Sequence, residues 1–385
     1  MNFEPSEEQV LIRQTARQIG ERHLAPVAQA LDNGQGHDDL LANLQRLAEA
    51  GFMGLNLPAE LGGTQAGTVA YALSIEELGR VCASTTVTVS ITNMVGEVIC
   101  ACGSDAQKSR HIPKLCDGTY PAASFCLTEA GAGSDPSAMT TSARRDGNEW
   151  VLNGTKQYIS SAQFAGLFVV WAVTDPAAKK GKNISCFLVE PSTPGVVIGK
   201  PEAKMGQHGS ITNPVSFDDC RLPADALMGR ENDGFRTAVA ELAGGRIGVA
   251  ALALGISRAA MDAARAYVLE RSQFGKKIAD FQGIQWMIAD RETELEAARL
   301  LILQAASLKD AGRPFATAAS MAKLFATEAA QRATYAALQL HGGAGYLKDL
   351  PLERYARDAR ITTIYEGTSE IQRLIIARAL LHETV

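Results

Sequence analysis

The chain has 385 residues, of which 46% are hydrophobic and 21% are charged, so we expect a globular protein with two or three hydrophobic cores. Its net charge of −5 gives no electrostatic reason to expect a nucleic acid as a partner. No apolar run reaches the ~20 residues of a membrane span, and the acidic first residues resemble neither a signal peptide nor a transit peptide. We therefore expect no membrane association and a bacterial cytoplasmic location, or the mitochondrial matrix for a mature eukaryotic form.

The first part of the chain has the pattern of α-helices. Ser6 to Gln9 resembles a helix capping sequence, and apolar residues follow it at helical spacing. A second run extends from Leu40 to Ala50, and after a glycine-rich loop helical patterns return between Ala70 and Leu115. We predict an N-terminal α-helical domain over residues 1–118.

The pattern changes near Tyr120, where short β-branched runs alternate with turn residues. Asn153-Gly154 is a strong signal for a hairpin turn. Further candidate strands cover Leu167 to Val173, Ile184 to Val189, Val196 to Ile198 and Pro214 to Phe217. Because no helical pattern separates these strands, we predict a middle antiparallel β-barrel, or a sandwich, over residues 119–230.

Helical patterns return after Asp233 and continue to the C-terminus. A long helix is expected from Phe235 to about Arg271. Three more are expected over Phe281 to Ala311, Ala316 to Leu340 and Ile371 to Leu381. This predicts a C-terminal four-helix bundle over residues 231–385 and, for the whole chain, an α+β multi-domain fold. No glycine-rich dinucleotide fingerprint follows a strand, and there is no P-loop.

The cysteines and histidines give no metal-binding pattern. The seven cysteines are scattered without a CxxC pair, and the six histidines are dispersed. We expect no metal site.

Four glycine-containing segments are ambiguous when each is taken alone. The loop Phe125–Asp135 leaves a strand and offers backbone N–H groups to an anionic ligand, although a plain turn has the same composition. Glu270–Gly275 closes the long helix, and Gln339–Tyr346 ends a later helix with glycines that have room for a phosphate. Inside the long helix, Gly244 and Gly245 each cost about 1 kcal/mol relative to alanine, which suggests close approach of a ligand or another backbone.

A fifth segment, Tyr365–Glu370, places a carboxylate beside a glycine at the start of a helix. Thr368 or Ser369 is expected to cap that helix through a side-chain oxygen. Gly367 allows close backbone approach or a positive φ angle.

Together these motifs resemble the acyl-CoA dehydrogenase family. The ordered set is Leu-Thr-Glu-x-Gly-x-Gly-Ser-Asp from residue 127, Glu-Arg-x-x-Phe-Gly from 270, Gln-x-x-Gly-Gly-x-Gly-Tyr from 339 and Ile-Tyr-Glu-Gly-Thr-Ser-Glu-Ile-Gln-Arg from 364. The resemblance covers nearly the whole chain. It is greatest to the short-chain (butyryl-CoA) branch, and two segments also resemble the isobutyryl-CoA, or short branched-chain, branch.

The resemblance implies FAD-dependent α,β-dehydrogenation of an acyl-CoA thioester to the trans-2-enoyl-CoA. Glu366 is then the base that removes the α-proton, and the β-hydride goes to flavin N5. Burial of this carboxylate would raise its pKa, and hydrogen bonds to the thioester oxygen would stabilise the enolate-like charge. The implied partners are an electron-transferring flavoprotein and further copies of the chain in a homotetramer, a dimer of dimers.

Matched residue by residue, the family pattern implies three groups of binding residues. Residues expected at the FAD of the same subunit are Phe125, Leu127, Thr128, Gly133, Ser134, Tyr158, Ile159, Ser160, Thr368 and Glu370. Residues expected at the adenine half of a neighbouring subunit's FAD are Arg271, Phe274, Gln282, Gln339 and Gly343. Residues expected at the substrate are Ser134, Arg246 and Gly367.

Two positions distinguish the chain within the family. In the isovaleryl and long-chain branches the base immediately precedes the arginine that corresponds to Arg246; here that position is Gly245, so Glu366 has no rival. Many members carry Asp or Asn where this chain has Ala243, which removes one expected contact to the CoA arm.

Several functions share this fold. An acyl-CoA oxidase usually carries an extra C-terminal domain, and a DNA-binding flavoprotein of the family would need a basic face, so we expect a dehydrogenase. A linear C4–C6 acyl group is the first expectation, and isobutyryl or 2-methylbutyryl is the alternative.

Overall fold

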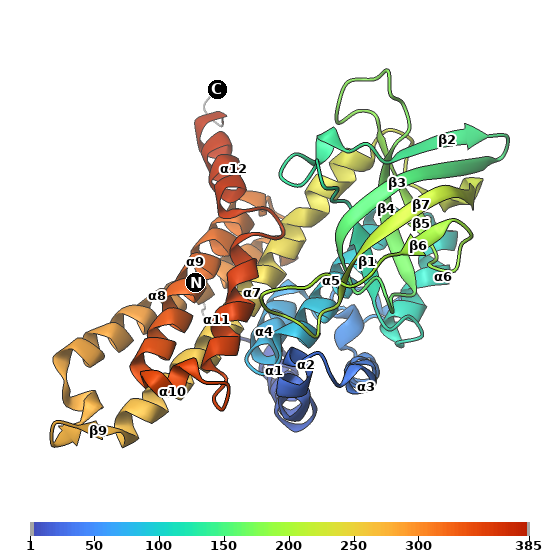
Figure 1. The fold of residues 1–385 in the computed structure, drawn as a ribbon. Helices are drawn as coiled ribbons and strands as arrows, with labels where there is room; N and C mark the ends of the chain where they lie inside the picture. The colour runs from blue at the N-terminus through green and yellow to red at the C-terminus, as the bar shows by residue number, and fades with distance from the viewer. Residues whose placement is uncertain (1–3, 383–385) are drawn as a thin grey trace.

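The computed structural model describes residues 4–382, which form a helical part, a β-sheet and a helical bundle in chain order (Figure 1). The first helices are α1 (Glu7–Ile19), α2 (Ala28–Asp32), α3 (His37–Glu49), α4 (Thr68–Gly79), α5 (Ala83–Cys102) and α6 (Asp105–Cys116). The predicted capping sequence is confirmed: Ser6 Oγ accepts from Gln9 N at 3.2 Å, and Gln9 Oε1 accepts from Ser6 N at 2.9 Å.

The sheet follows these helices. Its strands are β1 (Ala123–Cys126), β2 (Ser142–Asp146), β3 (Glu149–Ser160), β4 (Leu167–Val173), β5 (Ile184–Val189), β6 (Val196–Ile198), β7 (Thr212–Pro223) and β8 (Leu227–Met228). They are ordered β6-β7-β3-β2-β4-β5-β8, with β1 beside β4. Most neighbours are antiparallel as predicted, but β1 pairs with β4 in parallel. Within residues 4–382 no pairing joins β6 to β8, so the sheet is mixed and remains open.

Strand β4 shows how the sheet separates two hydrophobic cores. Its residues are buried on both faces, and successive side chains point in opposite directions. Leu167, Val169 and Trp171 pack toward α5 and α6, whereas Phe168 and Val170 pack into the core between the strands. Helices α5 and α6 therefore cover one face of the sheet.

The predicted hairpin turn at Asn153-Gly154 is wrong. Both residues lie inside β3, and the chain turns between Asp146 and Glu149 instead. Gly154 has φ +143°, and a Cβ atom there would lie 2.6 Å from the Thr141 Cα atom. The glycine is needed for this close backbone approach, next to a register shift in the β3–β7 pairing.

Replacing Gly154 with alanine is expected to destabilise the protein by about 2 kcal/mol or more, because the Thr141 backbone cannot move aside. The matched control is Gly147→Asn at the true turn. Gly147 has φ +61°, a Cβ atom added there would have no other atom within 4 Å, and asparagine tolerates this left-handed conformation. Thermal unfolding should show a clearly lower midpoint for the first variant alone; equal midpoints would contradict the steric argument.

The C-terminal part is a helical bundle, as predicted. Its elements are α7 (Gly234–Glu270), the short hairpin β9 (Ser272–Gln273) and β10 (Lys276–Lys277), α8 (Gln282–Asp310), α9 (Ala316–His341), α10 (Gly343–Tyr346), α11 (Leu352–Arg360) and α12 (Ser369–His382). Helix α7 runs from the sheet to the far tip of the bundle, where the hairpin lies (Figure 1). By length and composition α5 and α7 resemble membrane spans, but most of each is buried, as in the core helix of any globular protein.

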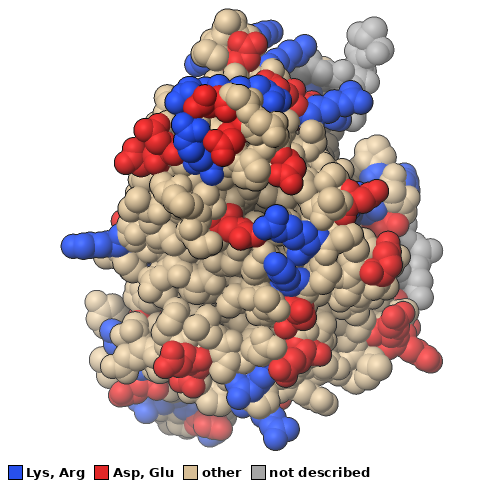
Figure 2. Space-filling model, turned by 90° about the vertical axis from the view of Figure 1, so that its right-hand side faces the viewer, with Lys and Arg blue, Asp and Glu red and all other residues tan. Residues whose placement is uncertain are grey.

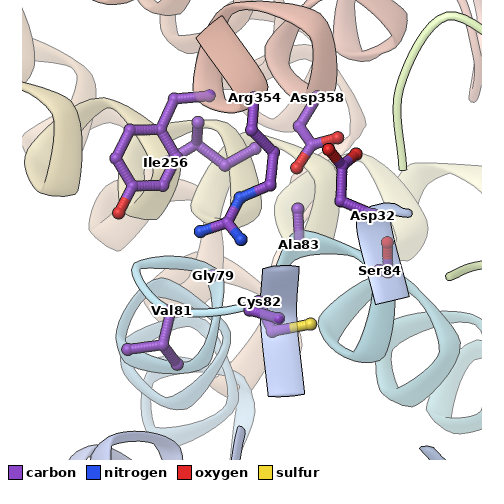
Figure 3. Close-up of a pocket in the computed structure, with 11 residues that line it drawn as sticks. Asp32, Gly79, Val81, Cys82, Ala83, Ser84, Ile256, Arg354 and Asp358 are labelled. Atoms are coloured by element: carbon purple, nitrogen blue, oxygen red, sulfur yellow. The ribbon is translucent and has the colours of Figure 1, made fainter. Parts of the chain in front are cut away.

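A polar junction joins the first and last parts of the chain. Arg357 of α11 donates to both carboxylate oxygens of Asp32 in α2, at 2.8 and 2.6 Å. Close by, Arg354, Asp32 and Asp358 point toward one small cavity of about 10 Å³, roughly the space of a single water (Figure 3). Glu366 does not line this cavity.

Candidate active site

Glu366 lies in a left-handed turn immediately before α12. Its φ angle is +55° and that of Gly367 is +91°. A non-glycine residue held in this region costs about 1–3 kcal/mol, and such residues concentrate at functional sites. Thr368 caps the helix that follows, because its Oγ1 accepts from Ile371 N at 3.3 Å. The predicted cap is therefore confirmed, and it is Thr368 that provides it.

The carboxylate of Glu366 faces the middle of α7. Its Oε2 atom is buried and has no hydrogen-bond partner within residues 4–382. A Cβ atom added to Gly245 would lie 2.9 Å from this oxygen and 2.7 Å from Met94 Sδ of α5. Glycine at position 245 therefore lets the Glu366 carboxylate and the Met94 side chain approach α7 closely. Burial raises the pKa of Glu366 to about 7, and the positive charges of Arg246 and Lys323 limit the rise.

Two buried side chains stabilise the turn by hydrogen bonds to its carbonyl groups. Lys323 of α9 donates through Nζ to the Gly367 carbonyl at 2.8 Å. Gln372 of α12 donates through Nε2 to the same carbonyl at 2.9 Å and to the Glu366 carbonyl at 3.1 Å. The position of the Glu366 carboxylate thus depends on α7, α9 and α12 together.

Hydrogen bonds bring the predicted flavin residues of β1 and β3 side by side. Gln157 N donates to Thr128 O at 2.8 Å, and Ser124 Oγ donates to Ser160 O at 2.7 Å. Tyr158 is 63% exposed with φ +61°, so its ring projects from the sheet, whereas Ile159 is buried in the core between the strands. Ile159 can therefore offer only its backbone to a ligand.

The other predicted flavin residues lie on β1 and the loop after it. Phe125 packs on Trp171, with ring centroids 4.3 Å apart, and Leu127 is buried. Gly133 and Ser134 are exposed farther along the loop.

A buried ion pair anchors this loop. Lys156 of β3 is completely buried; its Nζ donates to Glu129 Oε1 at 2.9 Å and to Leu127 O at 3.1 Å. Glu129 also accepts from the backbone N–H groups of Thr140 and Thr141. Burial alone would raise the pKa of Glu129, but the Lys156 charge and these hydrogen bonds hold it at about 2.

Thr368 and Glu370 border an open cavity of about 410 Å³ at the start of α12. Arg360 also lines it, as does Ser369, whose Oγ is buried without a partner among the described residues. A helix N-terminus, an arginine and an unpaired hydroxyl suit a phosphate or a sugar hydroxyl. The residues at this cavity therefore fit the polar part of a dinucleotide.

The residues predicted for a neighbouring subunit's cofactor form a separate group. Arg271, Phe274 and Gln282 lie around the β9–β10 hairpin at the tip of the bundle, away from the sheet (Figure 1). Gln339 and Gly343 lie at the end of α9. All five are exposed or half-buried, and the Phe274 side chain is 93% exposed. The structure does not bring this group to Glu366 in the same chain.

Of the predicted substrate residues, Gly367 adjoins the base and Ser134 is exposed on the loop after β1. Arg246 is buried, and its Nη1 donates to Ser320 Oγ at 3.3 Å. The sequence patterns did not identify Lys323, Gln372 and Met94 at the site. The one available signal was Lys323 itself, a charged residue within an alanine-rich helix pattern.

The surface charge is mixed. On the face shown in Figure 2, basic and acidic side chains are interspersed among wide uncharged areas, and no continuous basic surface is seen among the described residues there. No group of three or more His, Cys, Asp or Glu side chains within residues 4–382 is arranged to hold a metal ion.

Comparison with known proteins gives matches along the whole chain. Three family models match in order: "Acyl-CoA dehydrogenase, N-terminal domain" over residues 6–119, "middle domain" over 124–220 and "C-terminal domain" over 232–381. Acryloyl-CoA reductase (NADH) of Anaerotignum propionicum is 46% identical, with 99% of this chain and 96% of the relative covered.

Two solved structures are similar in both sequence and fold. The butyryl-CoA dehydrogenase of Megasphaera elsdenii has a TM-score of 0.95 and 37% identity, covering 99% of this chain and 100% of that one. A chain in the structure described as the electron transferring flavoprotein of Acidaminococcus fermentans has a TM-score of 0.96 and 42% identity, with coverage of 99% and 100%.

Proposed function

Because the chain belongs to the acyl-CoA dehydrogenase family, we propose that it converts a short-chain acyl-CoA to the trans-2-enoyl-CoA with Glu366 as the base. Members of the family are FAD-dependent oxidoreductases, and so is this enzyme. The observation that carries the proposal is the Glu366 Oε2 atom, which is buried, has no hydrogen-bond partner among the described residues and lies against Gly245 of α7. When bound, FAD would supply the acceptor for the hydride that leaves the β-carbon.

Glu366 is suited to remove a weakly acidic α-proton. Its carboxylate is poorly solvated, so its pKa is near 7 and its proton affinity exceeds that of a carboxylate in water. Among the described residues the Glu366 N–H donates to no backbone carbonyl, so this donor can serve the thioester oxygen. Such a donor would stabilise the negative charge that develops on that oxygen.

We assign the cofactor-binding roles to two groups of residues: one at the sheet and the start of α12, and one around the β9–β10 hairpin and the end of α9. Phe125, Leu127, Thr128, Tyr158, Ser160 and the Ile159 backbone would hold the flavin ring, Gly133 would lie near the diphosphate and Ser134 between the cofactor and the CoA arm, and Thr368 and Glu370 would also contact the FAD. Arg271, Phe274, Gln282, Gln339 and Gly343 would serve the cofactor of a neighbouring copy. Ser134, Gly367 and Arg246 would serve the substrate.

A homotetramer would explain the apolar surface of the bundle. Phe274, Tyr346, Tyr335 and Trp286 are each at least 64% exposed, and large exposed apolar side chains mark protein interfaces. We propose an electron-transferring flavoprotein as the electron acceptor. Similarity to a chain in the Acidaminococcus fermentans structure supports this partner.

The rate of substrate-dependent flavin reduction is expected to rise with pH through about 7 and then level off. The base acts only when ionised, and burial raises the pKa of Glu366 to about 7, so the protonated, inactive form dominates below that pH. Stopped-flow measurement of kcat/KM between about pH 5.5 and 9 reports the free-enzyme pKa. A flat profile over this range would contradict the assignment of Glu366.

An anaerobic titration tests the substrate class. The purified flavoprotein is mixed in turn with butyryl-CoA, isobutyryl-CoA and octanoyl-CoA, and the oxidised-flavin absorbance is followed. We expect the fastest bleaching with butyryl-CoA. Faster bleaching with isobutyryl-CoA would assign the branched-chain alternative, and no bleaching by any of the three would reject the short-chain proposal.

The acryloyl-CoA reductase relative favours one alternative, which is the reverse reaction. In that direction protonated Glu366 would deliver a proton to the α-carbon of a short enoyl-CoA. This alternative would be established if the enzyme reduced acryloyl-CoA with NADH as the reductant and oxidised no acyl-CoA.

A further inference from the structure

Lys323 is a lysine with no exposed surface inside the C-terminal bundle. It lies on α9, and Ala319, Ala322 and Ala326 around it on the helix are buried as well. Lysine is almost never fully buried unless it is paired, because removing the ammonium group from water is costly. Its position is therefore explained only by what its Nζ atom contacts.

The Nζ atom reaches the turn that carries the base. It donates to Gly367 O at 2.8 Å, and this carbonyl accepts a second hydrogen bond from Gln372 Nε2 at 2.9 Å. Two buried side chains from different helices thus converge on one peptide group next to Glu366. Since Glu366 and Gly367 both have positive φ angles, the turn depends on contacts outside itself to keep its shape.

The charges that face Glu366 come from several elements. Arg246 of α7 and Lys323 of α9 are positive, and Tyr71 of α4 and Tyr365 also interact with the carboxylate. Glu328 of α9 and Glu370 of α12 interact with Lys323. Burial lowers the pKa of Lys323 to about 8, while Glu366 opposes the shift, so Lys323 is charged at neutral pH.

We propose that Lys323 is a positioning residue for the base. It stabilises the Glu366–Gly367 turn through a hydrogen bond to the Gly367 carbonyl, and it places a positive charge near the Glu366 carboxylate. The inference rests on the proposed role of Glu366. Lys323 contacts the turn and not the carboxylate, so it acts through the backbone and through its charge.

Three substitutions separate the effect of the Lys323 hydrogen bond from the effect of its charge. Lys323→Met removes the hydrogen bond and the charge, Lys323→Gln keeps a donor but removes the charge, and Lys323→Arg keeps both. Without the charge the pKa of Glu366 should rise, because an opposite charge favours the ionised carboxylate. We expect the acid limb of the kcat/KM profile to move up by about one pH unit in the Met and Gln variants, which lowers kcat/KM roughly fivefold at pH 7 and roughly tenfold well below that pH. Arg should restore the wild-type limb.

A direct titration of the carboxyl group makes the test independent of turnover. The infrared band of the protonated carboxyl group, assigned by its loss in Glu366→Gln, is followed against pH in the FAD-loaded protein. The proposal predicts a higher midpoint in Lys323→Gln than in wild type. An unchanged midpoint in Lys323→Gln, or a loss of rate that is uniform with pH and not restored by Lys323→Arg, would overturn it.

The two proposals can fail separately. If Glu366→Gln keeps full activity, the base assignment fails and the Lys323 proposal fails with it. If Glu366→Gln is inactive but Lys323→Gln has a wild-type profile and midpoint, only the Lys323 proposal is wrong. Should Lys323→Met fail to fold, the Gln and Arg variants still decide the question.

Discussion

Replacing Glu366 with glutamine is expected to slow flavin reduction by a short acyl-CoA about 10³-fold, while the protein stays folded and retains FAD. The amide keeps the shape of the side chain but cannot accept the α-proton, and a positioned general base contributes roughly 10²–10⁴-fold to a rate. This is among the largest effects that we predict, because the amide cannot replace the buried, unpartnered Oε2 atom as a proton acceptor. Anaerobic stopped-flow absorbance with butyryl-CoA measures it directly.

The control for this experiment is Glu60→Gln, an equivalent change at an exposed glutamate in the loop before α4. It should leave the rate within about twofold of wild type, since surface substitutions of this kind have small effects. A Glu366→Gln rate within about tenfold of wild type would show that another group removes the proton. Gel filtration and the flavin spectrum of both variants would exclude misfolding or loss of cofactor as the cause.

Most of the fold follows from local sequence patterns. Helix α1 has apolar residues at helical spacing, and strands β4 and β5 are short continuous apolar runs rich in β-branched and aromatic residues, so local patterns predict them. The sequence pattern of α11 indicates only a polar, charged segment. Its Arg354 and Asp358 are buried in the polar junction, so its buried face mixes charges with the apolar residues Leu352 and Ala359 and does not show a purely apolar pattern.

The error at Asn153-Gly154 has a different cause. The dipeptide is typical of a two-residue hairpin, but the same glycine also permits a close approach to Thr141, which lies 13 residues away. No local pattern distinguishes these uses, because the second depends on how the strands pack. Tertiary contacts override local preference at such positions.

The candidate site likewise contains residues that the sequence predicts and residues that only the structure identifies. Glu366 follows from the family motif, and its left-handed turn is consistent with the adjacent Gly367. The partners that complete the site, Lys323 and Met94, are separated from Glu366 by 43 and 272 positions in the chain. Only the packing of α5, α7 and α9 brings them together, so they could not be assigned from the sequence without the structure.

Moving the base to position 245 should restore part of the activity that is lost when Glu366 is removed. A Cβ atom at Gly245 would lie 2.9 Å from the present Glu366 Oε2 and 2.7 Å from Met94 Sδ, so a side chain from α7 can enter the same space once Glu366 is absent and the flexible Met94 side chain moves aside. We expect Glu366→Gly alone to lose about 10³-fold in flavin reduction. The double variant Glu366→Gly/Gly245→Glu should recover at least about tenfold, whereas Gly245→Glu alone should be inactive because two carboxylates compete for one buried site.

Glycine tolerates φ +55° at position 366, so the turn should survive. Equal rates for the double variant and Glu366→Gly, with FAD bound to both, would show that position 245 cannot deliver a carboxylate to the reacting carbon.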